Sequence, residues 1–398
     1  MRNESTDKLD NKLQQHIARV RRRRLAVFLA VALLAAGVYF GVRYYRDHHH
    51  YGGYALRWEK ALESGGGGAQ YMQFGAHILK YSKDGASCID AKGKTLWMQS
   101  FEMKAPMAAG KGSYAAVADQ GGNQIYIFNG EGRQGVASTP AAILQVSVSA
   151  QGVVAAIVQD KNADMVLMFG KDGAQLDISM KGLLDGDIGF PFDVALSDDG
   201  TQLLGSFFRL SGDKLISSAA FFNFSDVGKD VPNRFVGGFD DLGEGSMAVR
   251  VWFFSDIYSL VATDMGMAFF STQNVKSPVL LANVPYAGEI AAIAPSERYL
   301  AVVSKSDDAL LPYRLDVYKP DGTQAFGKET AFAFSGVSVS GDYIILYNEN
   351  GCQVFNGKGT NVFEQDFDFT VDKVFAGGDG ASLFVVCRDA LREIAMKN

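Results

Sequence analysis

Strand–turn–strand units recur from Arg57 to the end of this 398-residue chain, and this repeat constrains the fold more than any other feature. Each unit combines an alternating apolar strand, a polar turn that contains Gly, and a second alternating strand. A strand-built repeat of about 40–50 residues is typical of a propeller blade, a four-stranded sheet that stacks with its neighbours around an axis. The turn glycines are 37 to 55 residues apart when a degenerate turn near Asn274 is included, and they are Gly93, Gly132, Gly173, Gly228, Gly322 and Gly359.

The two ends of the repeat region predict how the ring closes. No further strand follows Ser382–Cys387 and Leu391–Met396, whereas Tyr54–Leu62 is a strand without a blade of its own. Pairing this first strand with the last blade would seal the ring and protect an open edge. The sequence therefore predicts an all-β protein, a seven- or eight-bladed β-propeller, preceded by one N-terminal transmembrane helix. Eight blades are favoured, and seven stay open because Phe190–Leu281 is the least regular part.

An uncharged stretch of 18 residues, from Leu25 to Val42, precedes the repeats. Its length just suffices for a helix to cross the hydrocarbon core. Positive charge concentrated before it marks the N-terminal side as cytoplasmic. We therefore predict a cytoplasmic basic tail (1–24), a transmembrane helix (25–42), a juxtamembrane linker (43–53) and an extracytoplasmic propeller (54–398). The alternative is a cleaved signal peptide, whose apolar region is shorter, about 7–15 residues. The arginines assigned to the membrane anchor are Arg21, Arg22, Arg23 and Arg24.

Charge is distributed unevenly along the chain. Residues 1–51 carry a net charge of +6, and residues 52–398 carry −12. A domain this acidic repels nucleic acid, because affinity for nucleic acid rests on cationic contacts to phosphate. The predicted partners are therefore the membrane, through a single pass with the N-terminus inside, and an envelope protein or polymer, with no nucleic acid.

Residues that commonly carry chemistry are sparse in the predicted propeller, and we predict no catalytic, cofactor-binding or metal-binding residue. His77 is its one histidine and is interpreted as structural, while His48–His50 is interpreted as a spacer beside the membrane. Cys88, Cys352 and Cys387 show no zinc-binding spacing and are interpreted as buried apolar residues. Four acidic segments resemble Ca²⁺-binding loops but fit ordinary turns better, namely Leu184–Gly189, Ser197–Gly200, Phe239–Gly245 and Lys305–Asp308.

Aromatic runs distinguish the irregular part of the repeat region. Core packing between blades accounts for most of these side chains. An exposed aromatic patch in this region would instead mark a surface for a partner. The residues assigned to this predicted partner surface are Phe207, Phe208, Trp252 and Phe254.

One segment, CIDAKGKTLW (Cys88–Trp97), resembles the repeat of PQQ-like β-propellers, in which a Trp follows an Asp-x-x-Gly-Lys turn. Other units have Phe326 or Phe363 at the Trp position. The layout as a whole resembles an uncharacterised bacterial family, a domain of unknown function, of single-pass membrane proteins with a PQQ-like or WD40-like propeller ectodomain. This resemblance implies a fold and a location. It implies no activity and no quinone cofactor, because the sequence lacks the adjacent Cys pair of quinoprotein dehydrogenases.

Three functions are compatible with these features. The preferred hypothesis is a membrane-anchored, extracytoplasmic propeller that acts as a non-catalytic binding or scaffolding module in the cell envelope. A hydrolase or lyase acting on envelope glycans is the second, although it rests on acidic residues alone, since a fold does not define an activity. The third is a transmembrane sensor subunit, whose short tail would need a cytoplasmic partner.

Overall fold

The computed structural model describes residues 28–41, 44–45, 48–62, 68–160, 163–182, 189–240, 242–243, 245–378 and 380–398. The chain forms two compact units, Met1–His50 and Tyr51–Asn398. The described part of the first unit contains a helix over residues 28–41. Among the described residues, no helix combines the length and the apolar character needed to cross a membrane. Leu25, Val42 and the four anchor arginines lie outside the described residues, so the predicted span stays a prediction.

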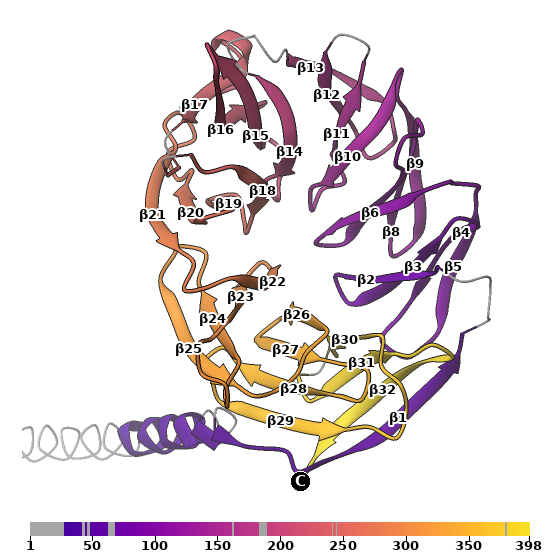
Figure 1. Ribbon diagram of the computed structural model, residues 1–398. Helices are drawn as coiled ribbons and strands as arrows, with labels where there is room; N and C mark the ends of the chain where they lie inside the picture. The colour runs from indigo at the N-terminus through magenta and orange to yellow at the C-terminus, as the bar shows by residue number, and fades with distance from the viewer. Residues whose placement is uncertain are drawn as a thin grey trace, which may run out of the picture. The chain divides into compact units, whose positions relative to one another are not determined.

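The second unit is a ring of eight four-stranded antiparallel sheets within the described residues (Figure 1). Blades 1 to 4 follow one another along the chain. Their strands, four to a blade, are β2 (Gln70–Phe74), β3 (His77–Ser82), β4 (Gly85–Ile89) and β5 (Thr95–Ser100), then β6 (Pro106–Lys111), β7 (Tyr114–Asp119), β8 (Gln124–Asn129) and β9 (Gly132–Ser138), then β10 (Ala142–Val148), β11 (Val154–Gln159), β12 (Asp164–Phe169) and β13 (Gln175–Gly182), then β14 (Phe190–Leu196), β15 (Gln202–Ser211), β16 (Lys214–Asn223) and β17 (Phe235–Phe239).

Blades 5 to 7 continue in the same way, and blade 8 takes its fourth strand from the start of the domain. Their strands are β18 (Ala248–Phe253), β19 (Tyr258–Thr263), β20 (Gly266–Ser271) and β21 (Val279–Pro285), then β22 (Ile290–Pro295), β23 (Leu300–Lys305), β24 (Tyr313–Tyr318) and β25 (Gln324–Thr330), then β26 (Gly336–Ser340), β27 (Tyr343–Tyr347), β28 (Gly351–Asn356) and β29 (Asn361–Asp366), and finally β30 (Lys373–Ala376), β31 (Ser382–Val386), β32 (Ala390–Lys397) and β1 (Gly53–Ala61).

The pairing of β1 with β32 closes the ring and confirms eight blades. The two strands run antiparallel from Gly53 opposite Lys397 to Ala61 opposite Ala390. A side-chain hydrogen bond also joins the two strands, because Arg392 on β32 donates to Glu59 on β1 at 2.7 Å. The predicted role of the orphan strand is therefore confirmed, and the irregular region holds two complete blades, 4 and 5.

One predicted turn glycine differs from the others. Gly93, Gly132, Gly173, Gly322 and Gly359 all have φ between 79° and 128°, a left-handed conformation that favours glycine. Gly228 does not adopt a left-handed φ. It lies in a longer connection between β16 and β17 that includes the short 3₁₀ helix η1 (Pro232–Arg234). Gly228 therefore lies in a turn, as predicted, and its N–H donates to the carbonyl of Ser225 at 3.1 Å, but the connection is longer than in the other blades and the glycine lacks the left-handed φ.

The glycine turns have a second role, because aromatic rings of the neighbouring blade pack on them. A Cβ atom at Gly93 would lie 2.9 Å from the indole of Trp58, and one at Gly359 would lie 2.7 Å from the ring of Phe326. Polar contacts fix two of the rings as well. The indole N–H of Trp58 donates to the carbonyl of Ala91 at 3.2 Å, and that of Trp97 donates to the carbonyl of Asn129 at 2.9 Å. Aromatic residues on the outermost strands β1, β5 and β25 therefore dock their blades onto neighbouring ones, whereas the turn at Gly173 packs against the backbone of Val136.

Replacing Gly359 by Ala tests this contact, with Gly121 as the matched control. Both glycines have nearly the same φ, 80° and 79°, but a Cβ at Gly121 would meet no atom within 4 Å. We expect Gly121→Ala to cost about 1–2 kcal/mol of unfolding free energy through backbone strain alone. Gly359→Ala should cost about 1–3 kcal/mol more, because the methyl group overlaps the ring of Phe326. Urea unfolding measures both values, and equal losses would contradict ring docking.

Candidate functional site

A cavity of about 450 Å³ lies among the innermost strands of the propeller. Its lining comes from β2, β6, β18, β22, β26 and β30, the innermost strands of six blades, and from the turns that follow some of them. A volume of this size suits a small organic ligand. The side chains that give the cavity its chemical character are Gln73, Lys111, Trp252, Phe253, Glu297, Arg298, Ser338, Ser340, Lys373 and Phe375.

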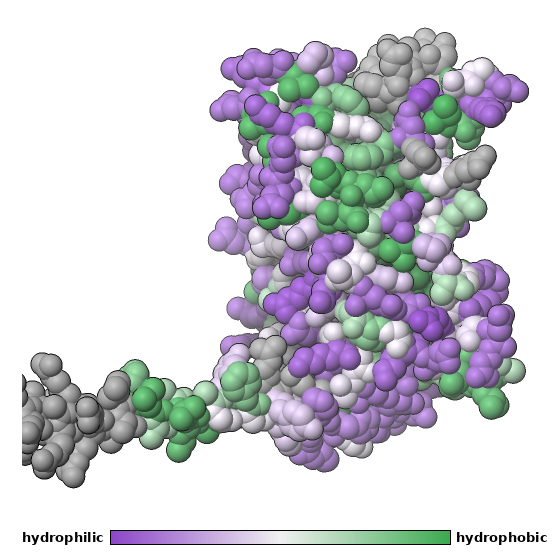
Figure 2. All heavy atoms as spheres, turned by 90° about the vertical axis from the view of Figure 1, so that its left-hand side faces the viewer, coloured by the Kyte–Doolittle hydropathy of each residue, from purple (hydrophilic) through white to green (hydrophobic). Residues whose placement is uncertain are grey.

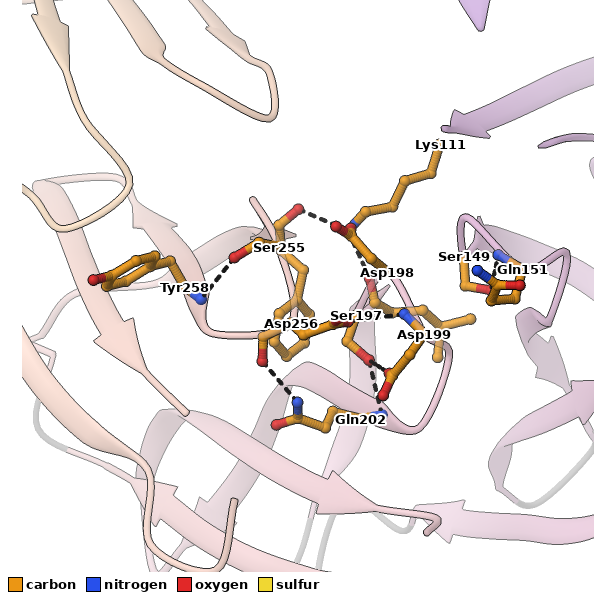
Figure 3. Close-up of polar contacts among 12 residues, drawn as sticks. Lys111, Ser149, Gln151, Ser197, Asp198, Asp199, Gln202, Ser255, Asp256 and Tyr258 are labelled. Carbon is orange, nitrogen blue, oxygen red and sulfur yellow. Dashed lines mark hydrogen bonds and ion pairs between the residues drawn. The ribbon is translucent and has the colours of Figure 1, made fainter. Parts of the chain in front are cut away.

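Lys111 ends β6 and connects three blades at one part of this cavity (Figure 3). Its ammonium donates to the carbonyls of Leu196 at 3.0 Å and Phe253 at 2.9 Å, the last residues of β14 and β18. The carboxylate of Asp198 lies 2.9 Å away. Burial lowers the pKa of Lys111, and Asp198 opposes that shift. Two carbonyls accept hydrogen bonds from the ammonium and the carboxylate of Asp198 forms an ion pair with it, so Lys111 is a clamp between blade 2 and blades 4 and 5.

Two further carboxylates, those of Asp199 and Asp256, lie in the turns after β14 and β18. The backbone N–H of Asp199 donates to Asp256 at 2.8 Å. Burial raises the pKa of Asp256, and the nearby Asp199 and Asp198 add to the rise. Burial would also raise the pKa of Asp199, but hydrogen bonds from Ser197 and Thr201 outweigh it and lower the pKa. The carboxylate of Asp199 thus serves its own turn, as Asp commonly does.

Asp193 on β14 makes a comparable connection inside the wall. Its side chain is 4% exposed and accepts hydrogen bonds from the amide of Gln145 at 2.7 Å and from the backbone N–H of Val251 at 2.9 Å. These partners belong to β10 and β18, so one carboxylate joins the innermost strands of blades 3, 4 and 5. Burial raises the pKa of Asp193, and the two hydrogen bonds oppose the rise.

Lys373 lines the same cavity but is bonded differently. It opens β30, and its ammonium donates to the carbonyl of Tyr71 at 3.1 Å. The nitrogen also lies 5.2 Å from the centre of the Phe375 ring. Burial lowers the pKa of Lys373. Within the part of the chain that the structure describes, no carboxylate lies within ion-pair distance of Lys373.

The four residues of the predicted partner surface do not form one. Phe207 and Phe254 are each 1% exposed, Phe207 in the hydrophobic cluster between blades 3 and 4 and Phe254 in the cluster between blades 5 and 6. Phe208 is half-buried against Phe192, with 5.2 Å between ring centres. Trp252 is half-buried and lines the central cavity instead. Packing inside the propeller therefore accounts for these four aromatic residues.

Exposed apolar side chains nevertheless gather on blades 4 and 5, on their outermost strands. Val279, Leu280 and Leu281 on β21 are 42–49% exposed, and Phe235 on β17 is 41% exposed. A bulge in the pairing of β21 with β20 falls between Leu280 and Ala282 and brings three consecutive apolar residues to the surface. Figure 2 shows apolar residues gathered on this edge of the propeller. We call these four residues the rim strip.

The remaining predicted residues occupy ordinary structural positions. His77 begins β3 and packs against Phe74, with ring centres 5.6 Å apart. Cys88, Cys352 and Cys387 are buried free thiols, and burial raises the pKa of each of them. No group of acidic, Cys or His side chains among the described residues is arranged to hold a metal ion. Of the four acidic segments, residues 184–188, 241 and 244 fall outside those residues.

Comparison with known proteins identifies a family for this chain and other proteins with a similar fold. The family of unknown function DUF5711 matches residues 47–396. The chain belongs to this family. Its fold resembles BamB from Moraxella catarrhalis, with a TM-score of 0.51 and 11% identity over 86% of this chain and 100% of that one. The Dos1 propeller gives a TM-score of 0.51 and 11% identity over 82% of this chain and 91% of that one. At such identity the likeness shows the propeller fold alone. No curated protein matches this DUF5711 member in sequence.

Substituting Lys111 tests its role as a clamp in this DUF5711 member. Lys111→Met leaves two buried carbonyls and the carboxylate of Asp198 without their donor. We expect a loss of about 1–3 kcal/mol in unfolding free energy, since Asp198 is 35% exposed and water can reach part of it. The control is Lys305→Met, whose ion pair with Glu289 is exposed and should contribute at most about 1 kcal/mol. Urea unfolding that gave equal losses for both variants would contradict the clamp.

Proposed function

We propose that this protein is a membrane-anchored, extracytoplasmic β-propeller that acts as a non-catalytic binding or scaffolding module in the cell envelope. Its partner is an envelope protein that docks on the rim strip. The observation that carries this proposal is the exposure of four apolar side chains on the outermost strands of two neighbouring blades.

The rim strip differs from the usual surface of an edge strand. Natural proteins commonly place charged residues on open edges, because unpaired backbone groups there can pair with another chain. Neither β17 (FVGGF) nor β21 (VLLANVP) has a charged residue. By contrast, the outermost strand of the next blade, β25, carries Lys328 and Glu329. The start of β21 also approaches β17, since a Cβ at Gly237 would lie 3.1 Å from Pro278.

Such an edge favours one kind of partner. Open N–H and C=O groups along β21 can hydrogen-bond to an extended segment, while apolar side chains provide burial on association. Contiguous exposed apolar surface of this kind commonly marks an interaction site. We therefore infer a protein partner that adds an extended segment along β21. A polymer without apolar groups would gain nothing from these side chains.

The proposed location rests on the sequence before the propeller. The uncharged run from Leu25 to Val42 is long enough to span a membrane as a helix, and the arginines before it favour a cytoplasmic N-terminus. A tether of this kind would keep the propeller, and any protein bound at its rim, close to the membrane surface.

Charged residues on the rim strip should abolish partner binding. In Val279→Lys/Leu281→Lys, two ammonium groups replace apolar contacts and guard the edge against strand addition. Proteins crosslinked to the full-length chain in the native cell, purified with it and identified by mass spectrometry should be lost from this variant. Leu310→Lys is the control, because Leu310 is 82% exposed and lies in blade 6, away from the rim strip. A partner set unchanged in the rim variant, or no reproducible partner with wild type, would contradict the proposed function.

Cysteine labelling tests location and orientation independently. The three native thiols are each at most 2% exposed, so a membrane-impermeant maleimide should label an introduced exposed cysteine far faster. We expect Leu310→Cys to react in intact cells, after removal of any outer wall layer. Thr6→Cys, in the predicted cytoplasmic tail, should react only after lysis. Labelling of Thr6→Cys in intact cells, or protection of Leu310→Cys until lysis, would overturn the proposed orientation.

A further inference from the structure

The two lysines of the central cavity differ in how many of their donors are used. Lys111 has three oxygen partners for three N–H groups. Lys373 has one, the carbonyl of Tyr71. Lys373 is half-buried. Burying an ammonium without a counter-ion is costly, and the cost falls when an anion pairs with it. Two N–H groups of Lys373 are therefore available to a ligand.

The other two cations of the cavity wall already have carboxylate partners. Lys111 pairs with Asp198, and Arg298 pairs with Asp342. Glu297 is exposed and acts electrostatically on Lys111. Lys373 thus carries the uncompensated positive charge of the cavity wall among the described residues.

Neutral polar groups and aromatic rings complete the surroundings. Gln73, Ser338 and Ser340 line the cavity beside Lys373, from the innermost strands of blades 1 and 7. The hydroxyl of Ser340 donates to Gln73 at 2.7 Å, and its lone pairs remain able to accept from a ligand. Trp252, Phe253 and Phe375 supply apolar contact area. This combination of one cation, a few hydroxyl and amide groups and several rings matches a small ligand that has an anionic group on an organic body.

We propose that the central cavity binds a small organic anion whose carboxylate or phosphate group is held by Lys373. Hydrogen bonds between ionised partners are roughly twice as strong as neutral ones. The negative charge of the rest of the domain disfavours a large polyanion, whose many charges would face many carboxylates. A small anion avoids this repulsion, because salt screens charges beyond about 8 Å at physiological ionic strength. This site is separate from the rim strip, which lies on outermost strands.

Calorimetric titration of the full-length protein in detergent micelles tests the site with three matched probes. Glucuronate carries a carboxylate and glucose 6-phosphate carries a phosphate on the same sugar, while glucose carries neither. Wild type should bind at least one of the two anions and should bind glucose at least about tenfold more weakly. The anion that binds more tightly identifies the preferred group.

Variants then assign the binding to Lys373. Lys373→Gln retains a donor for the carbonyl of Tyr71 but removes the charge, and it should weaken anion binding about tenfold to a hundredfold. Lys373→Arg should restore much of the affinity. Lys328→Gln, an exposed lysine on β25, is the control and should leave it unchanged. Ser340→Leu narrows the cavity without changing its charge and should also weaken binding, which keeps the test decisive if Lys373→Gln does not fold.

Three results would overturn the proposal. The first is that wild type and Lys373→Gln bind both anions equally well, or that neither binds them. The second is that glucose binds more tightly than the anions. The third is that Lys328→Gln weakens anion binding as much as Lys373→Gln does. None of them bears on the rim strip, so the proposed function and this inference can fail separately.

Discussion

The packing of an aromatic ring on the glycine turn of the neighbouring blade is the contact on which the ring assembly depends. The backbone ladders stop at the edge of each four-stranded sheet. Side-chain packing therefore holds most of the blades together, helped by backbone hydrogen bonds such as that from the N–H of Gly121 in blade 2 to the carbonyl of Ile143 in blade 3, at 2.8 Å. A glycine with positive φ makes the turn possible, and its missing Cβ leaves room for the ring of Trp58 or Phe326. The pairing of β1 with β32 then closes the ring with a ladder inside blade 8.

Blades 4 and 5 depart from this arrangement and use polar connections instead. The turn at Gly228 in blade 4 lacks the left-handed φ of the other turn glycines, and the atoms nearest to a Cβ there belong to Asn223 rather than to an aromatic ring. Asp193 joins the innermost strands of blades 3, 4 and 5, and Lys111 ties blade 2 to the strand ends of blades 4 and 5. Both groups are largely buried and hydrogen-bonded, as buried charges must be if they are not to destabilise the fold. The departure from the repeat and the polar clamps therefore occur in the same part of the molecule.

Periodicity explains why the fold could be predicted and the site could not. Turn spacing and the orphan strand Tyr54–Leu62 can be recognised from short stretches of sequence. They were enough to favour eight blades over seven and to predict how the ring closes. Lys111 and Lys373 lie 262 positions apart in the sequence, in strands of ordinary composition. Their burial and partners depend on the register of neighbouring strands, which no local pattern records. Phe207 and Phe254 were assigned to a partner surface because they are aromatic, yet packing between blades buries both.

The same strand geometry separates the two candidate binding surfaces. Trp252 lies on β18, the innermost strand of blade 5, and Leu281 lies on β21, the outermost strand of that blade. Two strands lie between them, so a protein held at the rim need not block a ligand at the axis. The chemistry also differs, because the rim offers an uncharged apolar edge and the cavity offers a cation with unused donors. One blade can thus contribute to both surfaces.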